Sequence, residues 1–370
     1  MNKKVVLLTA LLLWLLPALA MAEDYCTAAQ LHEQTDEHWV QTYQTSWRTV
    51  EIDTHVFTPD VQTMPVITVA YDLNDMASST GHYKVTRSKS GILHIDIGNI
   101  DKQRPNGTFH SAQYFAPYSS ASYAPGSSAD VDGALQEAEN MLNDCQLSAE
   151  LFDLARPEEV AVWWITDKKK NQIGDCEYCI SLKQTINQIP VLGHAFLGMP
   201  GSMRNGKGGE YFAEVGATMR YMNNEQVSFF GEILYETERI AEDIPLCSFD
   251  KIKSALEQEI TGGHLRKIYA LELGYVLYNV EGASKDPGSY WRKTAAYYAV
   301  PTWFVSCVYL DQAKKARTPS DDPEQASRSD VHSFVLLIDA QTGKMLPHKK
   351  SKHRGAADYR GIITWEDVEQ

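Results

Sequence analysis

The sequence predicts an α+β fold, with two helix-on-antiparallel-sheet units preceded by a small β-rich N-terminal region. Two amphipathic stretches predict helices that begin near Asp130 and Ser248. Each is followed by several short runs that are rich in apolar, aromatic and β-branched residues, which is typical of strands. The connections between these runs are too short to hold crossover helices, so the strands are expected to pair antiparallel. A helix laid across a curled sheet buries one face of each.

Residues 1–22 have the pattern of a cleavable secretion signal. Two lysines precede an apolar run at 5–16, and an Ala-Met-Ala sequence ends at Ala22. We expect cleavage before Glu23 and a mature chain that is secreted or extracytoplasmic. The alternative is an uncleaved anchor, since residues 5–22 are nearly long enough to span a bilayer. A lipid anchor is not expected, because the residues before Cys26 lack the small side chains of a lipid-attachment box.

The chain is acidic, with a formal net charge of -14 over 370 residues. Loss of the two lysines of the signal makes the mature form -14 - 2 = -16. A strongly negative field repels nucleic acid and anionic lipid, so neither is expected as a partner. Beyond Ala22 no segment is apolar enough to span a membrane, and no stable membrane insertion is expected after cleavage. The basic C-terminal tail at 347–370 is expected to be solvated.

The N-terminal region at 23–128 is expected to consist mainly of strands and loops. Residues 25–47 are polar and compatible with a helix. Three later runs alternate apolar with polar residues, which predicts half-buried strands. Residues 106–128 are rich in Ser, Tyr, Pro, Ala and Gly, as in a linker or a long surface loop. The three strands are expected at 49–57, 65–71 and 92–97.

The first helix-plus-sheet unit is expected at 129–246 and the second at 247–346. Ser248 can cap the second helix, and a Gly-Gly pair ends it. We expect Leu135 and Leu256 to be buried helix residues that face strands. The apolar helix positions are Leu135, Ala138, Met141, Leu142 and Cys145, then Phe249, Ile252, Leu256 and Ile260. The strands are expected at 160–166, 178–186, 211–221 and 226–235, then at 268–278, 300–310 and 333–339.

The cysteines all lie in the exported part, and an even set in an oxidising compartment suggests disulfide bonds. Their pairing is left open by the sequence. Cys176 and Cys179 form a Cys-x-x-Cys pair, but the pair opens a strand-like run, whereas redox dithiols sit at a helix N-terminus. We therefore expect no thiol-disulfide exchange there, and a structural bond between the two would need a turn at 171–175. The six are Cys26, Cys145, Cys176, Cys179, Cys247 and Cys307.

Asp339 and Gly343 predict a turn, because the Asp339 side chain can accept hydrogen bonds from following amides and Gly343 can take positive φ. Trp163 and Trp164 should point to opposite faces of one strand, so that one of them is exposed. A cluster of aromatic residues near 300 is expected in the core, and the alternative is a contact surface for a sugar or a peptide. The cluster is Tyr297, Tyr298, Trp303 and Tyr309.

No residue is predicted to be catalytic, cofactor-binding or metal-ligating, and no cofactor is expected. The chain has no Gly-x-Ser-x-Gly elbow, His-Glu-x-x-His helix or phosphate loop. His194 opens a glycine-rich loop without a recognisable motif. An acidic run before the second helix is expected to be a solvated edge, since paired carboxylates catalyse only when they face a pocket. That run is Glu232, Glu236, Glu238, Glu242 and Asp243.

Several short motifs follow one another in a characteristic order. They are Val50-Glu-Ile-Asp-Thr-His-Val-Phe-Thr-Pro-Asp with Met64-Pro-Val, Ala134-Leu-Gln-Glu-Ala-Glu-Asn-Met-Leu, Gln184-Thr-Ile-Asn-Gln-Ile-Pro-Val, Leu273-Gly-Tyr-Val, Ala299-Val-Pro-Thr-Trp-Phe and Leu337-Ile-Asp-Ala-Gln-Thr-Gly-Lys. Together they resemble a family of exported proteins, mostly clostridial lipoproteins, that is defined as a domain of unknown function. In the third motif Gln188 replaces the glycine of that family's Asn-Gly-Ile-Pro-Val. The C-terminal pattern is also similar to the PepSY group and to the YycI and YycH proteins.

The resemblance implies two PepSY-like or cystatin-like units that bind other proteins, since members of these groups regulate a sensor kinase or accompany extracellular proteases. The family's lipid-attachment cysteine has no counterpart here, so its membrane anchoring is not carried over. The expected function is an exported, non-catalytic binding or regulatory protein that contacts another envelope or extracellular protein. The alternative is a secreted hydrolase without a recognisable signature, because catalytic triads are defined by geometry.

Overall fold

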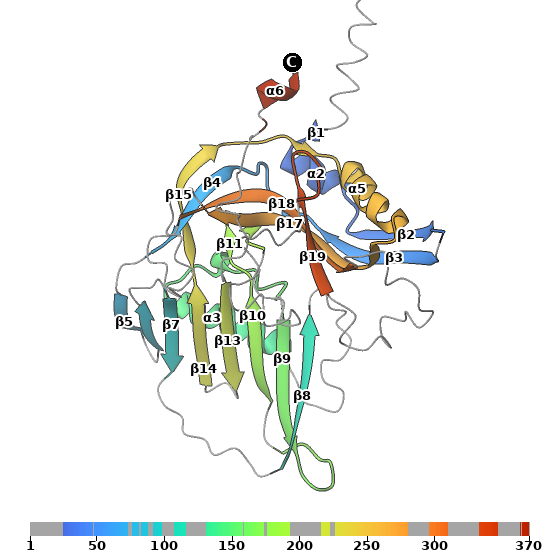
Figure 1. The fold of residues 1–370 in the computed structure, drawn as a ribbon. Coiled ribbons are helices and arrows are strands. Elements are labelled where there is room, and N and C mark those ends of the chain that lie inside the picture. Colours follow the sequence, from blue (N-terminus) through green and yellow to red (C-terminus); the bar gives the residue numbers. More distant parts are fainter. Residues whose placement is uncertain are drawn as a thin grey trace, which may run out of the picture.

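The computed structural model is α+β, mostly sheet with few helices, which confirms the predicted class at this level (Figure 1). Two large sheets make up most of the molecule, one of seven strands and one of eight. The structure describes residues 25–46, 48–72, 76–80, 83–87, 92–97, 107–115, 131–157, 159–173, 176–192, 216–222, 226–279, 296–309, 333–346, 363 and 365–369.

The seven-stranded sheet has the order β15-β4-β18-β17-β3-β2, and β19 pairs with β18 beside this path. Its pairs are antiparallel, except that β17 and β3 run parallel. The strands are β2 (His38–Gln44), β3 (Thr49–Phe57), β4 (Val66–Tyr71), β15 (Leu234–Ala241), β17 (Leu265–Asn279), β18 (Ala296–Tyr309) and β19 (Ser333–Asp339).

The eight-stranded sheet has the order β5-β6-β7-β14-β13-β10-β9-β8 and is antiparallel throughout. The short connections thus lead to the pairing that they predict. The strands are β5 (Met76–Thr80), β6 (Tyr83–Arg87), β7 (Ile92–Ile97), β8 (Thr108–Phe115), β9 (Glu159–Thr166), β10 (Glu177–Leu182), β13 (Gly216–Met222) and β14 (Gln226–Glu232).

The chain enters the seven-stranded sheet, leaves it and returns. Strands β2 to β4 belong to that sheet, every strand from β5 to β10 belongs to the eight-stranded sheet, and Ile233 alone separates β14 from β15. The sheets therefore change near 72–76 and at Ile233. The domain boundaries expected at 128/129 and 246/247 stay predictions. Local patterns place strands but not their distant partners, so the split of the N-terminal strands between two sheets leaves no trace in the sequence.

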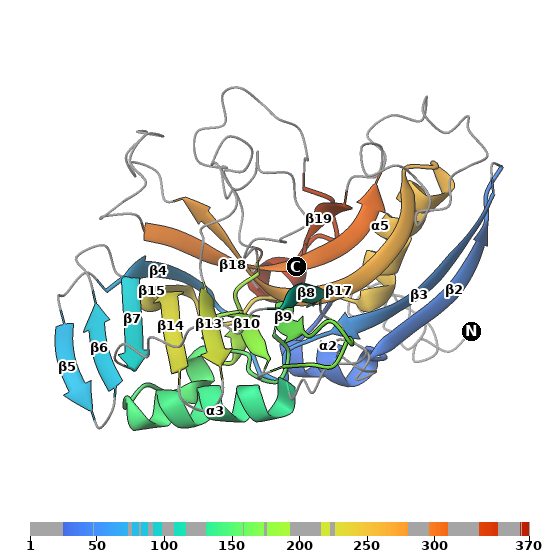
Figure 2. The ribbon, with the colours of Figure 1, turned by 90° about the horizontal axis from the view of Figure 1, so that it is seen from below.

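Each sheet carries a helix on one face. Helix α3 (Val131–Asp144) lies across the eight-stranded sheet (Figure 2), and α5 (Phe249–Thr261) lies on the seven-stranded sheet beside α2 (Ala28–Gln34). We call these the eight-stranded layer and the seven-stranded layer. The smaller elements are β1 (Tyr25–Cys26) with β16 (Leu246–Cys247), β11 (Thr185–Ile186) with β12 (Ile189–Pro190), the 3-10 turn η1 (Ala149–Leu151) and α6 (Trp365–Glu369).

Helix α5 matches its prediction closely. Its four apolar positions, from Phe249 to Ile260, are buried, and Leu256 is fully enclosed. Gly263 has φ 80°, the left-handed conformation that ends helices. Ser248 occupies the N-cap position, but its side chain makes no capping hydrogen bond, and its carbonyl accepts from the Lys251 amide instead.

Helix α3 bears out only part of its prediction. Ala138, Met141 and Leu142 are fully buried against the sheet, whereas Leu135 is half-buried and packs at the margin of that core. The buried stripe follows Ala134 and Ala138, so Leu135 lies one position round the helix from its centre. Leu256 therefore confirms the expected helix-on-sheet packing in full, and Leu135 confirms it in part.

Three segments that the sequence predicts as single elements are each divided into two in the structure. Residues 25–47 hold a seven-residue helix, α2, and then a strand, β2. The pattern does not separate the two, because the buried Trp39 and Tyr43 are four residues apart, a spacing that suits one face of a helix or of a strand. The single strands expected at 178–186 and 226–235 each break, the first before β11 and the second between β14 and β15. A continuous apolar run does not show where a strand changes sheet.

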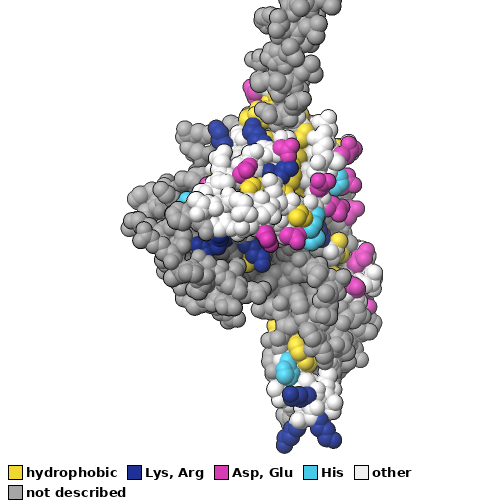
Figure 3. Space-filling model, turned by 90° about the vertical axis from the view of Figure 1, so that its right-hand side faces the viewer, with side chains coloured by type: hydrophobic (Ala, Val, Ile, Leu, Met, Phe, Trp, Pro, Cys, Tyr) yellow, Lys and Arg dark blue, Asp and Glu magenta, His cyan; other side chains and the backbone are white. Residues whose placement is uncertain are grey.

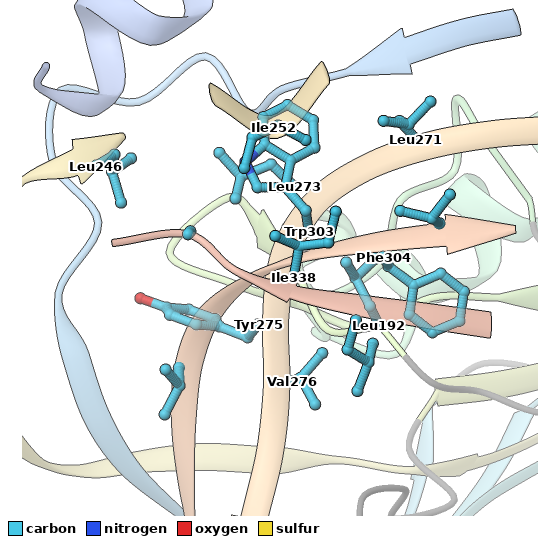
Figure 4. Packing of buried hydrophobic residues seen from close by; sticks show 14 of the residues in the cluster. Leu192, Leu246, Ile252, Leu271, Leu273, Tyr275, Val276, Trp303, Phe304 and Ile338 are labelled. Carbon is cyan, nitrogen blue, oxygen red and sulfur yellow. The ribbon is translucent and has the colours of Figure 1, made fainter. Parts of the chain in front are cut away.

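The core of the seven-stranded layer is built around fully buried aromatic residues. Trp303 lies below Ile252 and Leu273 on the helix side of the sheet, while Phe304 lies on the other side of β18 (Figure 4). The Tyr275 hydroxyl donates to the Pro65 carbonyl at 3.0 Å, which satisfies a polar group that the core encloses. These contacts hold β17 and β18 rigidly below α5.

Candidate interaction surface

Strand β2 is one edge of the seven-stranded sheet, and its pairing with β3 has no bulge. The amide of Val56 donates to the carbonyl of Glu37 at 2.9 Å, so this pair exchanges hydrogen bonds and the pairing alternates from there. It follows that the backbone N–H and C=O groups of Val40 and Thr42 point away from β3. Among the strands that the structure describes, none pairs with this side of β2, so these groups lie on an open edge.

The outer face of β2 and β3 is exposed and mixed in character. Val40 is 67 % exposed, and its cross-strand neighbour is Asp53. His38 Nε2 lies 2.6 Å from Asp53 Oδ1, and the rings of His38 and His55 are 5.0 Å apart. Acidic and histidine side chains gather on the upper part of the face shown in Figure 3. Exposed pairs of this kind add little to stability, so these groups can exchange partners at small cost.

A row of side chains leads inward from this edge. His55 stacks on Phe57, with the ring centroids 6.0 Å apart. The Arg156 guanidinium lies 4.8 Å from the centroid of the Phe57 ring, a cation–π contact. Arg156 comes from the loop after η1, which follows α3 in the eight-stranded layer. The row thus connects the open edge to the boundary between the two layers.

At that boundary four charged side chains form a cluster that we call the seam: Asp153, Arg156, Lys183 and Glu272. Lys183 Nζ lies 2.6 Å from Glu272 Oε1, and Arg156 Nη2 lies 2.7 Å from Asp153 Oδ2. The Lys183 side chain is only 4 % exposed. Removing charges from water is costly unless they are paired, and here two cations meet two carboxylates. Since Lys183 follows β10 and Glu272 belongs to β17, the seam joins the layers.

Neutral hydrogen bonds reinforce this joint. The Gln184 side chain is fully buried and bonds both ways with the backbone of Leu234, its Nε2 donating to the carbonyl at 2.5 Å and its Oε1 accepting from the amide at 2.9 Å. A side chain at Gly274 would overlap the Pro190 carbonyl, so glycine permits β12 to approach β17. The row of side chains that starts at the β2 edge therefore ends at a boundary that these hydrogen bonds and this close packing hold in place.

The predicted turn after β19 is confirmed. Asp339 Oδ1 accepts from the Gln341 amide at 3.0 Å and from the Thr342 amide at 2.7 Å. Gly343 has φ 67°, the positive value that the turn requires. These bonds give Asp339 a structural role.

The aromatic cluster contributes mainly to the core. Trp303 and Tyr297 are buried, as expected, and Tyr298 is half-buried, while the Tyr309 side chain is outside the described set. Trp163 and Trp164 are both half-buried, so the expectation that one is exposed is wrong. Trp164 packs against the core of the eight-stranded layer, and the His110 ring stacks on it with the centroids 5.4 Å apart. Nothing in the described part of the chain explains the partial burial of Trp163.

Only part of the acidic run is a solvated edge. Glu238 and Glu242 are exposed, and Glu236 accepts hydrogen bonds from Arg239 at 2.9 Å and from Asn187 at 2.7 Å. The bond from Arg239 is the main reason that the pKa of Glu236 is lowered. Burial raises the pKa of Asp243, which is half-buried. The Glu232 side chain lies outside the described residues.

The six cysteines are all described, and no disulfide bond joins them in the structure. Cys179 lies in β10 and Cys176 just before it, so the pair precedes a strand and not a helix, as the sequence indicates. The proposed lack of exchange activity stays a prediction. Burial raises the pKa of the Cys26 thiol to about 11 and that of Cys247 to about 12.

Several sequence predictions concern residues outside the described ranges: the signal at 1–22, His194 with its glycine-rich loop, and the basic cluster at 348–354. They stay predictions. Within the described ranges, no group of three or more His, Cys, Asp or Glu residues is arranged to hold a metal ion. None of the helices in these ranges is long and apolar enough to cross a membrane.

Neither the open edge at β2 nor the seam was predicted from the sequence. For β2 the sequence gives little signal, because the apolar Val40 is exposed, Gln41 interrupts any alternation, and the spacing of Trp39 and Tyr43 also suits a helix. The seam had no signal, since its residues are far apart in the chain and each resembles an ordinary surface charge.

Comparison with known proteins leaves the family open. No protein-family model and no curated protein matches the chain. Among solved structures, the chain is similar to an uncharacterized protein from Eubacterium rectale ATCC 33656, with a TM-score of 0.46 and 10 % identity over 89 % of this chain and 97 % of that chain.

Proposed function

We propose that the chain is an exported, non-catalytic binding or regulatory protein that holds an extended segment of another envelope or extracellular protein. The segment adds to the seven-stranded sheet as a strand beside β2. The open edge of β2 carries this proposal, because its outward N–H and C=O groups are the groups that strand addition uses. Most natural edge strands are protected by lysine, proline or a bulge, and β2 has none of these.

The side chains suggest what the segment contains. An added strand would lie about 4.8 Å from β2, with alternate side chains beside Val40 and Thr42 on the outer face. The exposed Val40 favours an apolar residue opposite it. The carboxylates of Glu51 and Asp53, exposed on the next strand, favour Lys or Arg, whose long side chains can reach across β2. The proposed ligand is therefore an extended peptide whose outer-face positions, which are every second residue, carry both apolar and basic side chains.

The finer architecture belongs to the same proposal. α3 lies on an antiparallel layer and α5 on one that is antiparallel except for the β17–β3 pair, which supports comparison with PepSY-like or cystatin-like units. The secretion signal at 1–22 supports the assignment to the envelope or the extracellular space.

The test separates the backbone of the edge from its side chain. Val40→Pro removes an outward N–H and leaves the β2–β3 bonds in place, whereas Val40→Thr keeps that N–H and removes only apolar surface. A partner captured from the native extracellular fraction should bind the proline variant at least tenfold more weakly and the threonine variant nearly normally. Amide exchange at Val40 and Thr42 should slow in the complex. Equal binding by both variants, with unchanged exchange, would rule out strand addition.

A further inference from the structure

Gln341, a buried residue in the Asp339 turn, forms hydrogen bonds with the backbone of a residue distant in the sequence, as a neighbouring strand would. Gln341 is 2 % exposed, and its Nε2 donates to the Ile363 carbonyl at 2.6 Å. Its Oε1 accepts from the Ile363 amide at 3.2 Å. One side chain thus satisfies both backbone groups of one residue. This recognition is independent of the Ile363 side chain.

Hydrogen bonds of the surrounding turn hold Gln341, and with it the side-chain amide, in place before any segment binds. The Gln341 amide donates to Asp339 Oδ1 at 3.0 Å, and Nε2 also approaches the Pro245 carbonyl at 3.4 Å. The Cys247 amide donates to the Ala340 carbonyl at 2.8 Å, which ties the turn to β16. A preorganised acceptor and donor bind with less loss of conformational entropy than flexible ones.

A second group selects the side chain two residues further on. The indole Nε1 of Trp365 donates to Asp243 Oδ2 at 3.0 Å. Asp243 lies between β15 and β16, next to Pro245, so both contacts are on the same part of the seven-stranded layer. A charged acceptor makes this a stronger hydrogen bond than one between neutral groups. A backbone pair and an indole donor two residues later define a short peptide pattern.

We propose that Gln341 and Asp243 form a peptide-binding site, separate from the β2 edge, that the chain's own Ile363 and Trp365 occupy. The site takes a peptide in which tryptophan follows two positions after the paired residue and begins a helical turn, as Trp365 begins α6. An intramolecular segment competes as if present at about millimolar concentration, so a partner peptide binds well only when that segment is weakened or displaced. The chain then has a second peptide-binding site, which its own Ile363 and Trp365 occupy and so block.

The test uses the full chain and a fluorescein-labelled peptide of residues 361–370. In Trp365→Ala the chain's own segment loses its indole contact, and the peptide should bind with an affinity at least tenfold higher than to the unchanged chain, as measured by fluorescence anisotropy. The same peptide with alanine in place of Trp365, or with an N-methylated Ile363 amide, should bind at least tenfold more weakly. These peptide controls leave the folded protein untouched.

A protein-side control completes the design. Adding Gln341→Ala to Trp365→Ala should abolish peptide binding, while Val40→Pro, which changes only the β2 edge, should leave it intact. Peptide binding that survives both the N-methyl change and Gln341→Ala would overturn the proposal, as would no binding to Trp365→Ala at millimolar concentration.

Discussion

Helices α5 and α3 cover different sheets, and they do so with different side chains. α5 presents Phe249, Ile252, Leu256 and Ile260, all buried, to a sheet that holds Trp303 at its centre. α3 presents two alanines with Met141 and Leu142, while its remaining leucine lies half outside the core. Large side chains fill a wide space between helix and sheet, whereas alanines let the helix backbone approach the sheet closely. The seven-stranded layer therefore depends more on individual large residues.

That difference also bears on function. The open edge of β2 belongs to the layer with the deeper core, so the proposed binding edge rests on the more firmly packed sheet. Binding groups on rigid elements lose little freedom when a ligand arrives. The following experiments ask how unequal the layers are and whether they fold as one unit.

The largest expected effect is that of Leu256→Ala, which should lower the free energy of unfolding by about 4 kcal/mol, because the site is fully enclosed. The matched change Leu135→Ala should cost about 1 kcal/mol, since that side chain is already half-exposed. Urea unfolding followed by circular dichroism measures both. Equal losses would show that the two helices pack alike and would remove the comparison.

The seam should couple the layers. Glu272→Gln leaves Lys183 buried without its closest carboxylate, and we expect a loss of about 3 kcal/mol. The double variant Lys183→Met with Glu272→Leu removes both charges and should lie within about 1 kcal/mol of the unchanged protein. If Glu272→Gln splits thermal unfolding into two transitions, the layers fold separately. A single transition at lower temperature is the result we expect.

Alkaline pH should weaken the seven-stranded layer more, because it holds Cys26, Cys247 and Cys307, all with pKa values raised by burial. Between pH 9 and 12 the folded protein keeps the Cys247 proton while the unfolded chain loses it, so stability falls as pH rises. Cys247 alone should account for about 0.4 kcal/mol at pH 9, where half of the unfolded thiols have lost their proton. In reducing buffer, Cys247→Ala should lose less stability between pH 7 and 9 than the unchanged protein. Identical pH dependence would contradict a buried neutral thiol.

Local pattern predicted much of this fold. Alternation placed β3 to the residue, an apolar run placed β19 to the residue, and helical spacing with a glycine stop placed α5. Sheet membership escaped prediction, because β3 pairs in parallel with β17, more than 200 residues later. The candidate edge and the Gln341 site also depend on contacts between residues far apart in the chain. Their residues are ordinary polar ones whose meaning comes from where the chain brings them.

The smallest expected effect concerns the hairpin that joins the layers. Asn187 and Gln188 connect β11 to β12 with φ values of 53° and 67°, the left-handed conformations of a two-residue type I′ turn. Asparagine tolerates this conformation, whereas glutamine is strained there by about 1 kcal/mol. Gln188 is exposed, so replacing it removes no packing.

Gln188→Gly should therefore stabilise the protein by about 0.5 kcal/mol, after allowing for the greater freedom of glycine in the unfolded chain. The melting temperature should rise by about 1 °C, measurable by calorimetry with replicate scans. Asn187→Gly is the matched control and should destabilise, because it removes the 2.7 Å hydrogen bond to Glu236 while relieving little strain. A fall in melting temperature with Gln188→Gly would show that the turn prefers a side chain there and that the hairpin is not a strained joint between the layers.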